Sequence, residues 1–343
     1  MAYEVKGAPF VFKGVTDVSH CKSAAEVMSE AGLDWIVSKC ELVAKMPINI
    51  NNKNNGFIHG LNNFVDCPNA YAIYRTDTNV PLGVVKERYT AVQNIEAFDF
   101  FDEAIGKNNA IWQTAGCFGN GERIFVSAKL PNNILVNGDP IENYLVFTNN
   151  HDGGGGVKIL FTPIRIICQN TLNSAIKNAT NYISFRHTKS IHEKIDVAAE
   201  LLGICAKYSS DFEEELNFMN TIKFTNEQAA DIFAKTILTK EELDRLHYTG
   251  HNSIQLASKY WSAIEDSEIS MKKVNAIAGM NDYYHTGIGQ REIIGTGYGV
   301  YNAISGFYSN VDKSTGAKRM DSLLYGDKSK KLQTAANMII YAA

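Results

Sequence analysis

The strongest constraint on how this chain folds is a run of four glycines between two apolar segments. Residues 142–179 read ENYLVFTNNHDGGGGVKILFTPIRIICQNTLNSAIKNA. Four consecutive glycines offer no side-chain packing and lose the most backbone entropy on ordering, so 151–156 is predicted to be a turn or loop. The flanking segments, 144–148 and 157–168, are rich in strand-forming side chains. Together they predict an antiparallel hairpin.

A helix is expected after the hairpin, and the whole unit is basic. Asn170 or Thr171 can act as an N-cap, because apolar residues then recur at helical spacing as far as Ala179. Residues 152–189 contain five bases and one acid, a local charge of +4, whereas the chain as a whole has a charge of −4. This contrast favours an anionic partner at this unit.

The length of 343 residues exceeds what one hydrophobic core usually supports. We therefore expect an α+β core domain over 1–188, with an antiparallel sheet of β-β-β-α organisation, and a helical C-terminal domain over 189–343. The six cysteines are widely spaced, which indicates free thiols in a reducing compartment. The N-terminus does not resemble a signal peptide, and there is no run of about 18 apolar residues, so a cytoplasmic protein without a membrane partner is expected.

Periodicity and turn residues predict the other elements. In the first part they are helices at 24–31 and 94–105, strands at 71–74, 82–85, 111–114 and 123–130, and an exposed asparagine-rich loop at 49–69. In the second part, an amphipathic helix is expected from 191, with a break near 209–210. Further helices are expected to begin at the capping boxes of Thr225 and Thr239, and others to lie at 253–264, 301–308 and 332–341. A loop is expected at 279–299. Residues 190–245 contain twelve acids and six bases, and this charge of −6 beside the basic unit predicts a homo-oligomer such as a ring.

Three catalytic or ligand-binding interpretations of the central unit are disfavoured. The glycines lie between two strands and are not followed by Lys-Ser/Thr, so they are not a nucleotide P-loop, and a flexible hairpin tip is expected. Cys168 with His151 and Asn170 has the residue types of a thiol protease, but a cysteine ending an apolar strand is expected to pack as a small side chain. The candidate metal ligands are best interpreted as surface or turn residues; they are His151, Asp152, His187 and His192. No catalytic residue, metal or cofactor is therefore assigned.

The basic residues suit a groove for single-stranded nucleic acid, although a solvated sheet face explains them equally well. On the second strand Lys158 shares a face with Leu160 and Thr162. Pro163 is expected at an edge or bulge, which would turn Arg165 onto the Lys158 side. Aromatic Phe147 and Phe161 are expected near the groove. The predicted nucleic-acid contacts are Arg123, Lys129, Lys158, Arg165, Lys177, Arg186 and Lys189, with Gln169, Asn170 and Asn173 at the helix start.

Several blocks of the sequence together resemble one known family. They are VVKERYTAVQNIEAFDFFDEAI, WQTAGCFGNGERIFVSAKLP, the central unit, RHT at 186–188, and YNAISGFYSNVDKSTGAKRMDSLLYGD. The chain is similar to the phage/plasmid-like family of unknown function number 932, whose members are carried by phages and plasmids. That resemblance implies a bacterial host cell but no activity that can be transferred residue by residue. At the level of architecture, the expected core is also similar to phage single-strand annealing proteins of the Erf and Red-beta/RecT kind.

These observations lead to one hypothesis and two alternatives. The hypothesis is a mobile-element protein that binds single-stranded DNA for annealing, recombination or replication, a role that needs no catalysis. The first alternative is an enzyme or sensor that holds a nucleotide or another phosphorylated ligand with the same glycines and bases. The second is a virion-associated or structural interaction protein.

Overall fold

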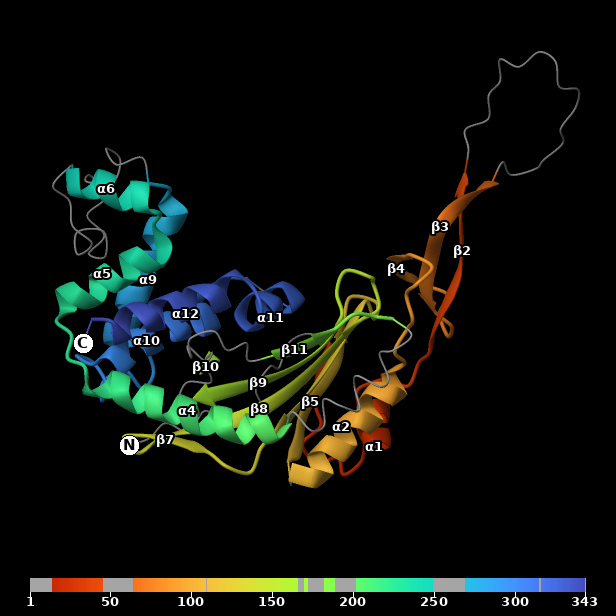
Figure 1. The fold of residues 1–343 in the computed structure, drawn as a ribbon, viewed down its shortest axis with the longest axis horizontal. Coiled ribbons are helices and arrows are strands. Elements are labelled where there is room, and N and C mark those ends of the chain that lie inside the picture. The colour runs from red at the N-terminus through yellow and green to blue at the C-terminus, as the bar shows by residue number, and fades with distance from the viewer. Residues whose placement is uncertain are drawn as a thin grey trace, which may run out of the picture.

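The computed structural model describes residues 14–45, 64–108, 110–165, 170–171, 182–188, 202–248, 269–314 and 316–342. It has a large antiparallel sheet, a small sheet that extends from it, and a C-terminal group of helices (Figure 1). The predicted α+β class with a helical C-terminal part is confirmed.

The large sheet has eight strands. Its main path is β1-β5-β6-β8-β9-β10, with β11 also paired to β9 and β7 paired to β8. The strands are β1 (Val15–Asp17), β5 (Ile111–Phe118), β6 (Arg123–Lys129), β7 (Ile134–Val136), β8 (Asp139–Asn150), β9 (Val157–Arg165), β10 (Asn170–Thr171) and β11 (Tyr182–Phe185). The predicted hairpin is confirmed, because β8 and β9 pair antiparallel around the glycines. The helix expected over 172–179 lies outside the described residues.

The pairing of β8 with β9 runs without a shift from Ile141 opposite Arg165 to Thr148 opposite Lys158. The bulge expected at Pro163 is therefore absent from this pairing, and strand alternation assigns position 165 to the face opposite that of Lys158. The sequence predicted that Arg165 would join the Lys158 face, and this prediction is wrong. Pro163 does fall at an interruption on the outer side, since β11 pairs with 157–160 and β10 with 164–165.

Helices cover both faces of the large sheet. On one face α1 (Ala24–Glu30) and α2 (Asn94–Asn108) bury Phe98, Phe101 and neighbouring residues against alternate side chains of β8 and β9, such as Phe147. On the other face α11 (Gly316–Leu324) contributes a smaller cluster. The predicted start of α1 is confirmed, because the Ser23 side chain caps this helix. α2 continues through Gly106, where its end was expected.

The small sheet consists of β2 (Val37–Lys45), β3 (Phe64–Arg75) and β4 (Pro81–Val85) in that order. Figure 1 shows β2 and β3 projecting away from the rest of the molecule, and we call this ribbon the β2–β3 arm. The strands predicted at 71–74 and 82–85 are confirmed. The loop expected at 49–69 is wrong for residues 64–69, which belong to β3, and its other residues up to 63 lie outside the described ones.

The C-terminal helices enclose the nearly all-buried α10 (Gly297–Gly306). The others are α4 (Leu202–Thr221), α5 (Asn226–Ile237), α6 (Lys240–Tyr248), α9 (Met271–Thr286) and α12 (Asp327–Ile340), with a π-helical turn η1 (Phe307–Val311). Both capping boxes, at Thr225 and Thr239, are confirmed by reciprocal hydrogen bonds. The break expected near 209–210 is wrong, because α4 is continuous there. The loop expected at 279–299 is also wrong at both ends, because α9 continues to Thr286 and α10 begins at Gly297.

The helical core reaches the sheet through Ile134, Val136 and Ile141 of β7 and β8. Of the helices in the described ranges, none has the length and apolar character needed to cross a membrane.

Candidate functional site at the glycine loop

The loop of residues 151–156, which we call the glycine loop, is packed between two strands and is not the flexible tip predicted from the sequence. A Cβ on Gly156 would lie 2.0 Å from the Phe185 carbonyl oxygen of β11. On the other side, a Cβ on Gly83 of β4 would lie 2.2 Å from the Asp152 carbonyl oxygen. Gly153 has a φ of +76° and would bring a Cβ within 2.8 Å of Val85. The glycines are therefore needed for close backbone approach.

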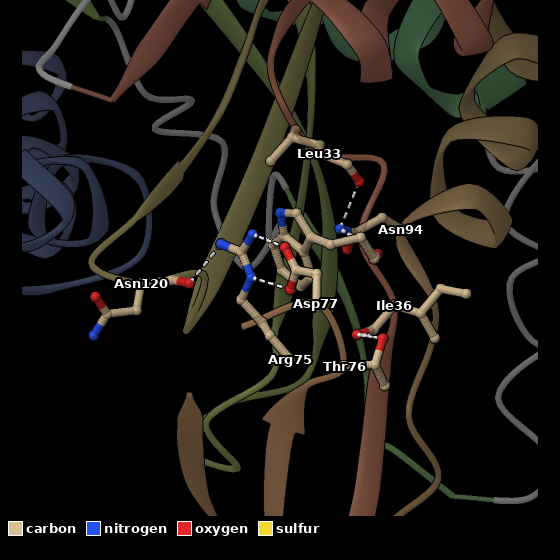
Figure 2. A network of polar contacts seen from close by, with 8 residues as sticks. Leu33, Ile36, Arg75, Thr76, Asp77, Asn94 and Asn120 are labelled. Carbon is tan, nitrogen blue, oxygen red and sulfur yellow. Dashed lines mark hydrogen bonds and ion pairs between the residues drawn. The ribbon is translucent and has the colours of Figure 1, made fainter. Parts of the chain in front are cut away.

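His151 was predicted to be a surface or turn residue; it lies at the turn, at the start of the glycine loop, but is fully buried. Its Nε2 is 2.9 Å from Asn94 Oδ1. The Asn94 amide nitrogen donates to the Leu33 carbonyl oxygen at 2.9 Å (Figure 2), which fixes Oδ1 as an acceptor. Nε2 therefore has the proton and Nδ1 the lone pair. Burial, helped by the nearby His187, lowers the pKa of His151 to about 3.

His187 is the second buried histidine beside this loop, and it too was predicted to be a surface or turn residue; it lies at a bend but not at the surface. Its Nδ1 lies 3.2 Å from the Thr90 carbonyl oxygen, and its ring stacks on Tyr89 with centroids 4.6 Å apart. The Tyr89 hydroxyl donates to the Asn150 carbonyl oxygen at 3.1 Å. Burial lowers the pKa of His187 to about 4, against the opposing effects of the Thr90 carbonyl and Asp152. His151 and His187 are thus neutral side chains that support the glycine loop.

Arg75 ties the base of the β2–β3 arm to the same region (Figure 2). Its guanidinium donates to both Asp77 oxygens, at 3.0 and 2.7 Å, and to the Asn120 carbonyl oxygen at 2.9 Å. It also lies 4.5 Å from the ring of Trp35, which makes an edge contact with His151 at 5.4 Å. These contacts use three of the five guanidinium N–H groups and one face of the guanidinium, so we assign Arg75 to holding the scaffold.

Four cationic side chains at exposed positions surround the glycine loop, and we call them the basic rim: Lys39, Lys86, Arg88 and Arg186. Lys86 follows Val85, which Gly153 approaches, and Arg186 follows Phe185, which Gly156 approaches. Lys39 Nζ donates to the carbonyl oxygens of residues 87 and 89 at 2.9 and 3.4 Å, which joins β2 to the turn that contains Arg88. The Thr90 N–H donates to the His187 carbonyl oxygen at 3.2 Å, which joins that turn to the Arg186 segment.

Of the predicted contacts whose side chains the structure describes, Arg186 is the one exposed cation at this loop. Arg123 forms an ion pair with Asp321, and Lys129 forms one with Glu142. Lys158 is half-buried, with its Nζ 4.0 Å from the Tyr325 ring centre. The structure shows only the backbone positions of Arg165 and Asn170, in β9 and β10. Gln169, Asn173, Lys177 and Lys189 lie outside the described residues.

The aromatic residues expected along a groove are unsuitable for stacking on bases, because Phe147 and Phe161 are buried. Sequence reasoning missed Lys39, Lys86 and Arg88. Two of these stand in the VVKERYT block, where a Lys-x-Arg pair directly after a strand was the available signal. Within the described ranges no three His, Cys, Asp or Glu side chains form a potential metal site. Cys168 and His192 lie outside those ranges.

These features define an α+β protein whose glycine hairpin is set rigidly between two other strands and bordered by cations. The model of the family described as domain of unknown function (DUF932) matches residues 81–336, and the chain belongs to this family. The match starts at the first residue of β4, so it includes the glycine loop but not the β2–β3 arm. No curated protein and no solved structure matches the chain.

Proposed function

We propose that this protein binds single-stranded DNA across the glycine loop, with phosphates held by the basic rim. The observation that carries the proposal is the arrangement of Lys86, Arg88 and Arg186, which come from two separate segments of the chain and border one loop, while Lys39 anchors the turn that contains Arg88. Exposed cations along a surface suit a polyanion, because each neutralised phosphate releases counterions.

The glycine loop itself supports a backbone contact. Gly153 and Gly154 are exposed and have no side chains, so a phosphate can approach their backbone closely. The Gly154 N–H donates to Asp152 Oδ1 at 2.7 Å, so the carboxylate is turned into its own loop. Within residues 85–90, 152–157 and 183–188 the acids are Asp152 and Glu87, against the three cations Lys86, Arg88 and Arg186. The local excess is positive although the whole chain is acidic.

The role that we propose for this binding follows the resemblance of the sequence to phage and plasmid proteins. Such a protein would act in the cytoplasm of the bacterial host, where it would help strands anneal, recombine or replicate. Annealing requires only that one strand be held with its bases accessible, so the buried, neutral His151 and His187 need no catalytic role. We also propose that the protein forms a homo-oligomer. Light scattering at working concentrations would contradict this by showing a single 38.0 kDa protein chain, both alone and in the complex with DNA.

The test is a fluorescence anisotropy titration of a labelled oligo-dT strand at several salt concentrations. For single strands, the slope of log K against log salt is about −0.7 per neutralised phosphate. The triple variant Lys86→Ala, Arg88→Ala, Arg186→Ala should therefore flatten the slope by up to about 2.

The matched control removes the same number of exposed cations from the C-terminal helices and the loop between them. Lys240→Ala, Lys272→Ala and Arg291→Ala should leave the slope unchanged, since all three are exposed and lie away from the glycine loop. Lack of binding at low salt would end the proposal. Displacement of the strand by micromolar mononucleotide would show instead that the rim holds a small phosphorylated ligand.

A further inference from the structure

A second basic surface lies on the sheet face below α11. Arg123 pairs with Asn150 across β6 and β8, and Lys158 pairs with Thr148 across β8 and β9. Residues 148 and 150 have the same parity on β8, so both cations lie on one face of the sheet. Burial and the nearby charge of Arg123 lower the pKa of Lys158. Two like charges placed together on a half-buried face favour an anionic partner.

In this structure α11 and the residue that follows it contact both cations. The Asp321 carboxylate forms the ion pair with Arg123. The Tyr325 ring lies 4.0 Å from Lys158 Nζ, and its hydroxyl is 3.3 Å from Thr148 Oγ1. A negative group and a planar ring, four residues apart, are the two features that each nucleotide of a strand presents.

We infer that this face is a second contact surface for single-stranded nucleic acid, and that α11 occupies it with Asp321 in place of a phosphate and Tyr325 in place of a base. The inference rests on the proposed function, and it identifies α11 as a segment that the strand displaces. The apolar contact of α11 with this sheet face is made by Met320 and Leu324, which pack on Phe118, Phe125, Val146 and Leu160, while Leu323 packs on the helical core. Gly326, between α11 and α12, gives the chain a point at which α11 can rotate.

The surface is continuous with the glycine loop. Asn150, opposite Arg123, is the residue directly before the loop, and Lys158 is the second residue after it. The His151 N–H donates to the Glu122 carbonyl oxygen at 2.8 Å, so the residue before Arg123 also contacts the loop. A strand bound at the basic rim can therefore pass around the end of the hairpin to this face.

The test compares the wild type with the double variant Asp321→Asn, Tyr325→Ala in the anisotropy titration with oligo-dT. The strand no longer has to displace the Asp321 carboxylate and the Tyr325 ring, so its Kd should fall roughly tenfold. Adding Arg123→Ala and Lys158→Ala to the double variant should flatten the salt slope by up to about 1.4, because two phosphate contacts are lost. Asp327→Asn, which removes an exposed charge at the start of α12, is the matched control and should have no effect.

A second measurement on the unaltered protein keeps the inference falsifiable if a variant unfolds. Hydrogen exchange in 316–325 should become faster when oligo-dT binds, because the strand displaces α11. Binding by the wild type with an unchanged Kd in the folded double variant, or with unchanged exchange in 316–325, would overturn the inference and leave the proposed function intact. Failure of the wild type and the double variant to bind at low salt would remove both.

Discussion

The two buried histidines predict a loss of stability in mild acid. Burial holds the pKa of His151 at about 3 and that of His187 at about 4, whereas both have values near 6.5 in the unfolded chain. Between pH 6.5 and about 4 the unfolded state therefore binds two protons that the folded state does not. Stability is fully present above pH 6.5 and falls as the pH is lowered.

The magnitude follows from the width of this window. Each histidine costs about 1.4 kcal/mol per pH unit, so lowering the pH from 6.5 to 5 removes about 2 kcal/mol for each and about 4 kcal/mol together. That is a large fraction of the 5–15 kcal/mol typical of a folded domain. Asp152 is the charged group that opposes this effect at His187.

The assay is urea unfolding at pH 7 and pH 5. The wild type should lose about 4 kcal/mol more between these values than the double variant His151→Asn, His187→Asn, whatever the stability of that variant at pH 7. His285→Asn, at an exposed position on α9, is the control and should retain the wild-type loss. Equal losses in the wild type and the double variant would refute the assignment of two neutral, buried rings.

Two further substitutions test how the sites are built. Gly156→Ala places a Cβ 2.0 Å from the Phe185 carbonyl oxygen, so it should lower the free energy of unfolding in urea by about 1–3 kcal/mol. Gly154→Ala brings its Cβ to 3.1 Å from a side chain only, so it should change that free energy by no more than about 1 kcal/mol. Equal losses in the two variants would contradict the packed loop. Burial raises the pKa of Asp312, but the hydrogen bond and charge of Lys328, whose Nζ is 2.8 Å away, lower it to about 2. Lys328→Met should therefore lower the free energy of unfolding at pH 7 by roughly 1–3 kcal/mol. An unchanged melting temperature would refute this prediction.

Local sequence patterns were sufficient for most elements of the fold. The glycine hairpin follows from two apolar runs on either side of residues that cannot pack, and the starts of α5 and α6 follow from capping boxes that span three residues. The errors arise where distant contacts decide. Residues 64–69 have the composition of a loop, but pairing with β2 makes them a strand.

The candidate site was harder to predict for the same reason. The burial of His151 depends on Asn94, which is 57 residues away in the sequence. The ion pair that covers Arg123 comes from Asp321, 198 residues later. Charge counting pointed to residues 152–189, but it could not tell which cations the chain itself neutralises. Lys86 and Arg88 were overlooked because they lie near the glycine loop through the contact between that loop and β4, which is far from it in the sequence.

The most direct test of the central claim is a hydrogen-exchange footprint of the wild-type protein with and without oligo-dT. If the strand lies across the glycine loop, exchange should slow in 85–90, 152–157 and 183–188, the three segments that carry or border the basic rim. Exchange should stay unchanged in α9, which lies among the C-terminal helices. Protection confined to the C-terminal helices, with none in these three segments, would contradict the account.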